Sequence, residues 1–178
     1  MKHTVGMLVL LAALLLAGPV ATSRAQDGMQ QQQSHSPSES VRHLWDYIGG
    51  KLVIMAQDWP EDKYSYRLNA DVRTFQQVLL HVAGDNYMLI NRNSGKKVGD
   101  ERNDPAVSDY KTKEQTVNFL KKSLADGEAE IAREGDAGVL KNLPDWIGWI
   151  EHMGEHYGLL VAYYRNNGVV PPDSRPSK

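Results

Sequence analysis

Residues 145–166 read DWIGWIEHMGEHYGLLVAYYRN, and this stretch decides the fold. We expect one amphipathic helix from about Asp145 to Asn166, with Gly168 as its left-handed C-cap residue. His152 and His156 lie four residues apart in it, so their Cβ atoms would be about 5–6 Å apart on one face. That spacing lets two imidazoles hold one metal ion from a single rigid helix.

The sequence indicates a first helix that begins after Ser36. Ser36 is a good N-cap, Pro37 suits the first helical position, and Glu39 completes a capping box. An apolar stripe then keeps a helical spacing to about Asp58. Its members are Val41, Leu44, Trp45, Ile48, Leu52 and Met55.

A second helix is predicted after Thr74, which caps it with Gln77 at the third position, and it ends near Asn91. On a helical wheel, His81 and Asp85 stand together on one flank of its apolar face. They are therefore expected to be partly buried and aimed at a neighbouring helix. The apolar face consists of Phe75, Val78, Leu79, Val82, Asn86, Leu89 and Ile90.

A third helix opens at about Thr112 and stops near Gly135, and Gly127 in it favours close approach of another helix. Gly138 and Pro144 bracket a short connection to the last helix, whereas residues 96–111 form a polar loop. Nothing alternates with the period of a strand. The sequence therefore predicts an all-α fold, a four-helix bundle over residues 37–178.

The first 25 residues have the features of a secretory signal peptide. A short basic start precedes an apolar run too short to span a membrane, and cleavage is expected after about Ala25. Residues 26–36 contain four consecutive glutamines and are expected to be a disordered tether. The mature protein is therefore predicted to be exported, periplasmic or extracellular, with no membrane segment after cleavage.

Composition limits the possible chemistry. The chain has 22 acidic and 20 basic side chains, a formal net charge of −2 and no basic run, which argues against nucleic acid. It has no cysteine, so disulfides, thiolate metal sites and cysteine nucleophiles are excluded. Any metal ion must be bound by His, Asp or Glu.

His81 is the candidate third ligand for His152 and His156, because metal sites in bundles are built from inward side chains on facing helices. Three protein ligands leave a coordination position open, which is typical of catalytic or substrate-binding sites. The alternative is that these are boundary histidines bonded to carboxylates such as Glu151 or Asp85. The metalloprotease motif His-Glu-x-x-His is excluded, because the position after His152 is Met153.

Residues 72–83 (VRTFQQVLLHVA) and 151–161 (EHMGEHYGLLV) resemble the DinB-like family, also called DinB/YfiT-like metalloenzymes and unrelated to the DNA polymerase of similar name. The tail 164–175 (YRNNGVVPPDSR) looks like the secreted members, and the resemblance covers about Glu39 to Arg175. It implies a metal triad of His81, His152 and His156, with none missing.

The resemblance also implies an activity. Relatives use zinc or a similar ion, with nickel or iron as alternatives, to activate a low-molecular-weight thiol for transfer or isomerisation. Because this chain is predicted to be exported, away from the cytosol where such thiols abound, a hydrolase acting on a small molecule is equally available. A further alternative is a non-catalytic metal- or ligand-binding stress or carrier bundle, and another is a metal-free structural module. Homodimers are common among such bundles, although no residue here argues for one.

The sequence assigns no catalytic residue. Asp85, one turn after His81, is a candidate general base or hydrogen-bonding partner of the ligands, the alternative being a boundary polar group. Trp149 and Tyr163 share the histidine flank of their helix and are expected near the site. His43, Arg165 and Arg175 are expected to be solvated, although either arginine could bind an anionic substrate.

Overall fold

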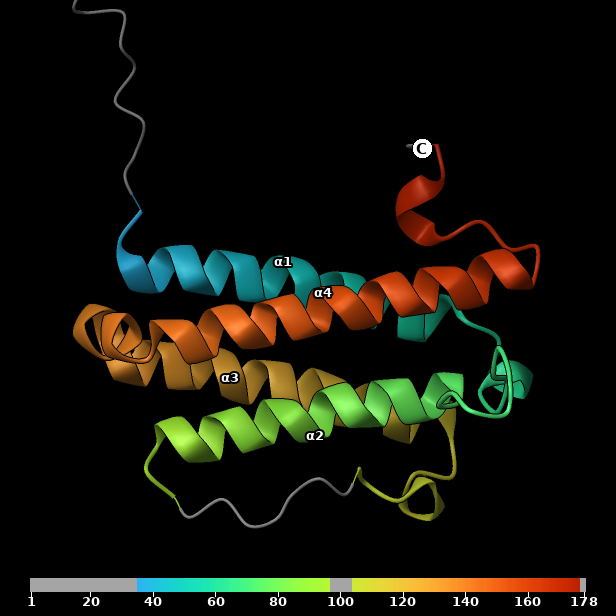
Figure 1. Ribbon diagram of the computed structural model, residues 1–178, viewed down its shortest axis with the longest axis horizontal. Coiled ribbons are helices and arrows are strands. Elements are labelled where there is room, and N and C mark those ends of the chain that lie inside the picture. Colours follow the sequence, from blue (N-terminus) through green and yellow to red (C-terminus); the bar gives the residue numbers. More distant parts are fainter. Residues whose placement is uncertain (1–34, 97–103, 177–178) are drawn as a thin grey trace, which may run out of the picture. The chain divides into compact units, whose positions relative to one another are not determined.

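The computed structural model describes residues 35–96 and 104–176, and within these ranges it holds four α-helices and no strand (Figure 1). The helices are α1 (Pro37–Asp58), α2 (Phe75–Asn93), α3 (Lys113–Lys141) and α4 (Leu143–Asn166), with short 3-10 turns η1 (Glu61–Lys63), η2 (Val107–Asp109) and η3 (Pro172–Ser174). The predicted all-α four-helix bundle is confirmed. The predicted signal peptide and most of the predicted tether lie outside the described residues. Among the described helices, none has the length and apolar character that crossing a membrane requires.

Local sequence explains where the first three helices begin. Ser36, Thr74 and Thr112 each accept a hydrogen bond from the backbone of the third helical residue, whose Glu or Gln side chain accepts one from the cap backbone in return. These are complete capping boxes, which satisfy donors that a helix start leaves unpaired. After the C-terminal end of α4, Gly168 has a φ of +68°, as predicted.

The helices are arranged in a ring in which α3 and α4 each pack against both α1 and α2 (Figure 1). Helix α1 is antiparallel to α2, and α2 and α3 run in the same direction (Figure 1). Helix α4 is antiparallel to α2 and lies beside it. This pairing of α2 with α4 positions the histidines.

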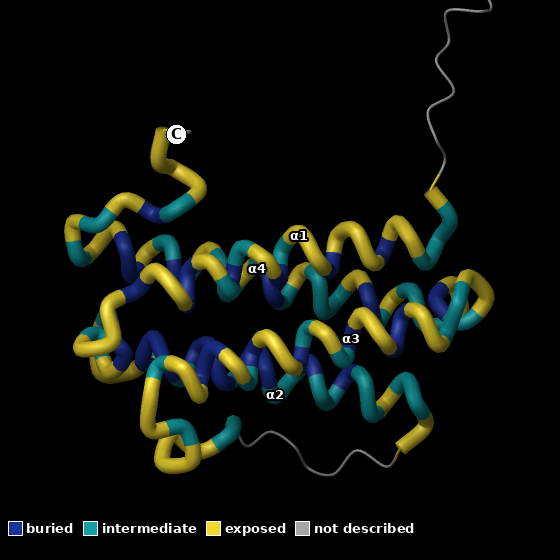
Figure 2. Tube along the Cα trace, turned by 180° about the vertical axis from the view of Figure 1, so that it is seen from behind, coloured by how far each residue is buried: buried dark blue, intermediate teal, exposed yellow. Residues whose placement is uncertain are grey.

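The core lies along the inward faces of the helices (Figure 2). Helices α1 and α3 approach closely because glycine replaces a side chain at the contact. A Cβ atom added at Gly127 would stand 2.3 Å from the ring of Trp45, and one at Gly49 would stand 2.7 Å from Leu124. The expected role of Gly127 is thus confirmed. Leu44 does not belong to the buried stripe, since it is 49% exposed.

The predicted connection between the third and fourth helices is wrong. Gly135 does interrupt the helix, with a φ of +59°, but α3 resumes and runs to Lys141, and α4 begins at Leu143 with Pro144 in its first turn. The tight corner is closed by the carboxylate of Glu134. It accepts hydrogen bonds from Asn142 and from the indole of Trp146, both at 3.0 Å, so a helical turn replaces the expected loop.

Candidate metal centre

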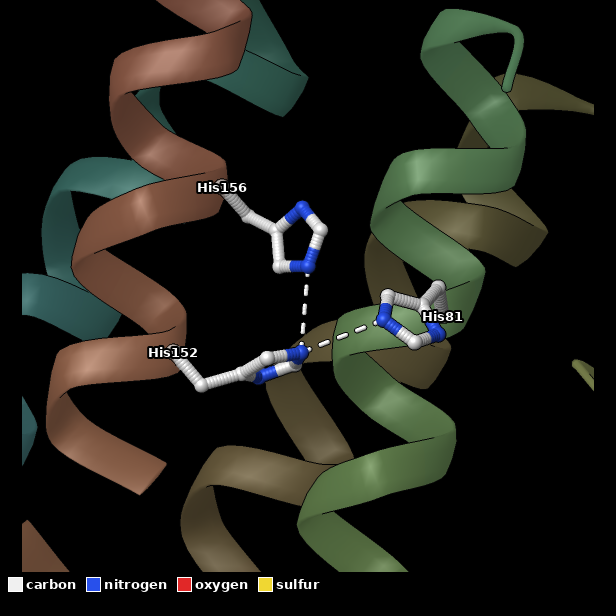
Figure 3. Close-up of side chains that lie close together, drawn as sticks. All are labelled: His81, His152 and His156. Carbon is white, nitrogen blue, oxygen red and sulfur yellow. Dashed lines mark hydrogen bonds between the residues drawn. The ribbon is translucent and has the colours of Figure 1, made fainter. Parts of the chain in front are cut away.

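His81, His152 and His156 converge between α2 and α4 (Figure 3). The Nε2 atom of His152 lies 3.1 Å from that of His81 and 3.0 Å from that of His156. One ring nitrogen from each residue lies within 4.8 Å of the others. The three histidines are therefore positioned to bind one metal ion.

Their spacing fits the requirements of a metal ion. Two nitrogens bound to zinc at about 2.0–2.1 Å with tetrahedral angles lie about 3.3–3.4 Å apart. The observed separations of 3.0 and 3.1 Å are slightly shorter, so small rotations of the imidazoles would bring these two pairs to that spacing. The side chains of His81 and His152 are 15% and 22% exposed, so a small molecule can reach the centre from solvent.

Neutral imidazoles do not give each of these two contacts a well-directed proton of its own. His81 donates its Nδ1 proton to a carboxylate, so its Nε2 presents a lone pair. If His152 donates from Nε2 to His81, it has no lone pair left on that atom for His156. If it accepts from His156 instead, two lone pairs face each other at 3.1 Å. A cation that accepts all three lone pairs removes this conflict.

Burial keeps the two histidines of α4 neutral. Burial, followed by the neighbouring imidazoles, lowers the pKa of His156 to about 4. Burial also lowers the pKa of His152, and the nearby carboxylate of Asp85 opposes this effect in part. Neutral imidazole is the form that binds metal ions, so the ligands are ready at neutral pH.

Asp104 is a site residue that the sequence did not predict. Its Oδ1 accepts a hydrogen bond of 2.7 Å from His81 Nδ1, and its Oδ2 pairs with Arg73 at 2.7 Å. Burial opposes ionisation of Asp104, but the bonds from Arg73 and His81 outweigh it and lower its pKa. A carboxylate in this position fixes the histidine tautomer and increases the basicity of its free nitrogen.

Only His81 is oriented in this way among the described residues. The Nδ1 atoms of His152 and His156 are buried, and no side chain or backbone group of the described ranges bonds to them. Their orientation comes from α4 and its packing. The bond to Asp104 is therefore the main polar constraint on the three-histidine cluster.

Asp85 faces the same nitrogens. Its Oδ2 lies 3.3 Å from His152 Nε2 and 3.6 Å from His81 Nε2, and its side chain is 22% exposed. It therefore lies beside the metal-facing atoms and not behind the imidazoles. This position allows it to act on a molecule bound at the centre.

Of the two aromatic residues expected near the site, Trp149 lies there and Tyr163 does not. Trp149 donates its indole N–H to the backbone oxygen of Asp85 at 2.8 Å, which brings it to the site. Tyr163 instead packs among core aromatics and donates to the backbone oxygen of Arg73, so it lies behind the site.

The remaining charged candidates lie elsewhere. His43 and Arg165 are exposed, as expected. Arg175 is exposed as well, and its guanidinium also holds both carboxylate oxygens of Asp58, at 2.8 and 2.6 Å.

A scan of protein-family models and a search of curated proteins found no match to this chain. The resemblance to the DinB-like family therefore stays a prediction.

Proposed function

We propose that this protein is an exported metal-dependent enzyme of the DinB-like kind, a transferase or hydrolase acting on a small molecule. His81, His152 and His156 would hold a divalent ion, for which zinc is the first choice and nickel or iron the alternatives. One observation carries this proposal: a ring nitrogen from each of the three histidines converges on one place, and two of the Nε2 separations, 3.0 and 3.1 Å, are close to those of metal ligands.

The donor set supports the choice of metal. Three neutral imidazoles suit zinc, nickel and iron, whereas calcium and magnesium prefer oxygen ligands. A divalent ion held there would supply Lewis acidity and lower the pKa of a coordinated thiol or water. This chemistry serves a thiol S-transferase and a hydrolase equally well.

The residues around the three histidines would orient a ligand ring and accept a proton. Asp104 holds the His81 ring by its Nδ1 atom, and Arg73 holds Asp104. Asp85 stands 3.3 Å from His152 Nε2, where its Oδ2 can accept a proton from a molecule bound at the centre. Partial exposure of the ligands admits the substrate from solvent.

Metal content tests the proposal. The purified protein, expressed in medium supplemented with zinc or nickel, should contain about one ion per chain, and a His81→Ala variant should lose it. His43→Ala is the matched control, because His43 is exposed and lies outside the cluster. Trace metal in the parent protein, or equal content in the His81→Ala variant, would refute the metal function.

A cobalt-substituted sample separates catalysis from storage. An open coordination position predicts that the cobalt absorption bands shift on addition of a thiol or azide. A spectrum that does not respond would favour the alternative, a non-catalytic bundle that carries or senses the ion.

A further inference from the structure

A cavity of about 270 Å³ adjoins the candidate metal centre between α2 and α4. It is lined by Asp85, Met88, Gly148, Trp149 and His152. Because α2 and α4 are antiparallel (Figure 1), these residues lie together on the side of His152 that faces away from His156. A larger hollow of about 530 Å³, between Gln57 and Lys121, includes none of the three histidines.

The lining is mainly apolar, with two polar residues among the five. Asp85 and His152 supply the charged and metal-facing groups, whereas Met88, the indole of Trp149 and the backbone of Gly148 supply the rest. Ligand pockets of this kind bind the apolar body of a small molecule and orient it by a few polar groups. Thioether and indole walls are well suited to a flat ring.

The indole wall is held in place without a ligand. Its N–H donates to the Asp85 backbone at 2.8 Å, and the guanidinium of Arg92 lies over its ring at 5.7 Å from the centroid. Arg92 is itself fixed by an ion pair with Asp145. A preformed wall lowers the entropy cost of binding.

Gly148 accounts for part of the empty space. A Cβ atom added there would meet no neighbouring atom within 4 Å, although the residue lies in a packed helix beside the cavity. A side chain at this position would therefore occupy the cavity without displacing the core.

We propose that this cavity binds a ring-sized apolar part of the substrate and so places the reactive group beside Asp85 and His152. The absence of a side chain at Gly148 sets the largest ring that the cavity accepts. The inference rests on the proposed function, because the ion would act on the group so positioned. It assigns the substrate class: a small molecule with an aromatic or similar apolar ring next to its thiol or scissile bond.

Bromobenzene tests the cavity without requiring a metal ion, because its heavy atom quenches a neighbouring indole. We expect saturable quenching of the full chain, mostly lost in Trp149→Phe, since the other three tryptophans are fully buried in the core. Gly148→Leu should weaken binding at least about tenfold, and Gly148→Ala less. Gly158→Leu is the matched control, because Gly158 lies in the same helix, also has an open Cβ position and is exposed. Non-saturable quenching, or equal binding by Gly148→Leu and the parent protein, would overturn the inference.

A comparison of two thiol ligands tests whether the cavity and the metal centre bind one molecule together. The cobalt-loaded protein should bind 2-phenylethanethiol about tenfold or more tightly than 2-mercaptoethanol, because only the former places a ring in the cavity. Gly148→Leu should remove this preference, whereas Gly158→Leu should keep it. Equal affinity for both thiols in the parent protein contradicts the inference. Failure to bind cobalt contradicts the proposed function instead, and the bromobenzene titration then decides the cavity alone.

Discussion

Replacing Asp104 should weaken metal binding although Asp104 would not touch the ion. Its carboxylate accepts the Nδ1 proton of His81 at 2.7 Å, and among the described residues this is the only bond to an Nδ1 atom of the three histidines. Loss of such a partner typically reduces metal affinity 10–100-fold, or about 1.4–2.7 kcal/mol. We therefore expect Asp104→Ala to bind zinc 10–100-fold more weakly, with about one ion still bound at saturation.

Stability measurements provide the assay. At free zinc 100-fold above the dissociation constant of the parent protein, the ion stabilises that protein by about 2.7 kcal/mol. Under the same conditions it should stabilise Asp104→Ala by only about 0.4–1.4 kcal/mol. Urea unfolding of each protein with and without zinc gives both values, and comparison within each protein cancels any effect on the metal-free fold.

Arg73→Ala is the matched control. It removes the same Arg73–Asp104 ion pair but keeps the bond between Asp104 and His81. The zinc affinity of this variant should fall by less than that of Asp104→Ala, because Asp104 still accepts the proton of His81. If Asp104→Ala binds zinc as tightly as the parent protein, or if Arg73→Ala loses equally much, the orienting role of Asp104 is wrong.

Three further predictions concern the fold and the ion. Gly127→Ala should lower the free energy of unfolding by about 1–3 kcal/mol, since its Cβ atom would stand 2.3 Å from a buried indole. Gly50→Ala, whose Cβ atom would meet open space, should raise the free energy of unfolding by up to about 1 kcal/mol. Urea titrations of both variants measure these changes. Arg175→Gln should lower the free energy of unfolding at pH 7, because it removes the charged partner of Asp58. The hydrogen bond from Arg175 is the main cause that lowers the folded-state pKa of Asp58. The loss of stability in Arg175→Gln should therefore become smaller below about pH 4, as Asp58 becomes protonated. An equal loss of stability at pH 2.5 and pH 7 would contradict this prediction. A chelator should lower the melting temperature of the zinc-loaded protein but not that of His156→Ala, and equal responses would count against the site.

Much of the fold could be predicted because its signals are local. Ser36, Thr74 and Thr112 each begin a capping box within four residues, so the helix starts needed no tertiary information. The corner after Gly135 could not be predicted in the same way. Its helical geometry depends on Glu134 reaching Trp146, twelve residues away, and such a contact leaves no periodic pattern.

The candidate site divides along the same line. His152 and His156 were recognisable because four residues of one helix separate them, and His81 because the flank of its helix could be read from a wheel. Asp104 lies 23 residues after His81 at the edge of a polar connection, and nothing in that segment distinguishes it from other surface aspartates. Only the packing of residues 104–109 against α2 brings it to the imidazole.

The distribution of the ligands along the chain affects how the ion would be exchanged. Two ligands belong to α4 and remain four residues apart even in a partly unfolded chain, whereas His81 lies on α2, 71 residues before His152. An ion bound by all three would therefore link α4 to α2. Local separation of these two helices would leave the ion bound only by His152 and His156. The rate of ion exchange should consequently report how often the α2–α4 contact opens, well before the whole bundle unfolds.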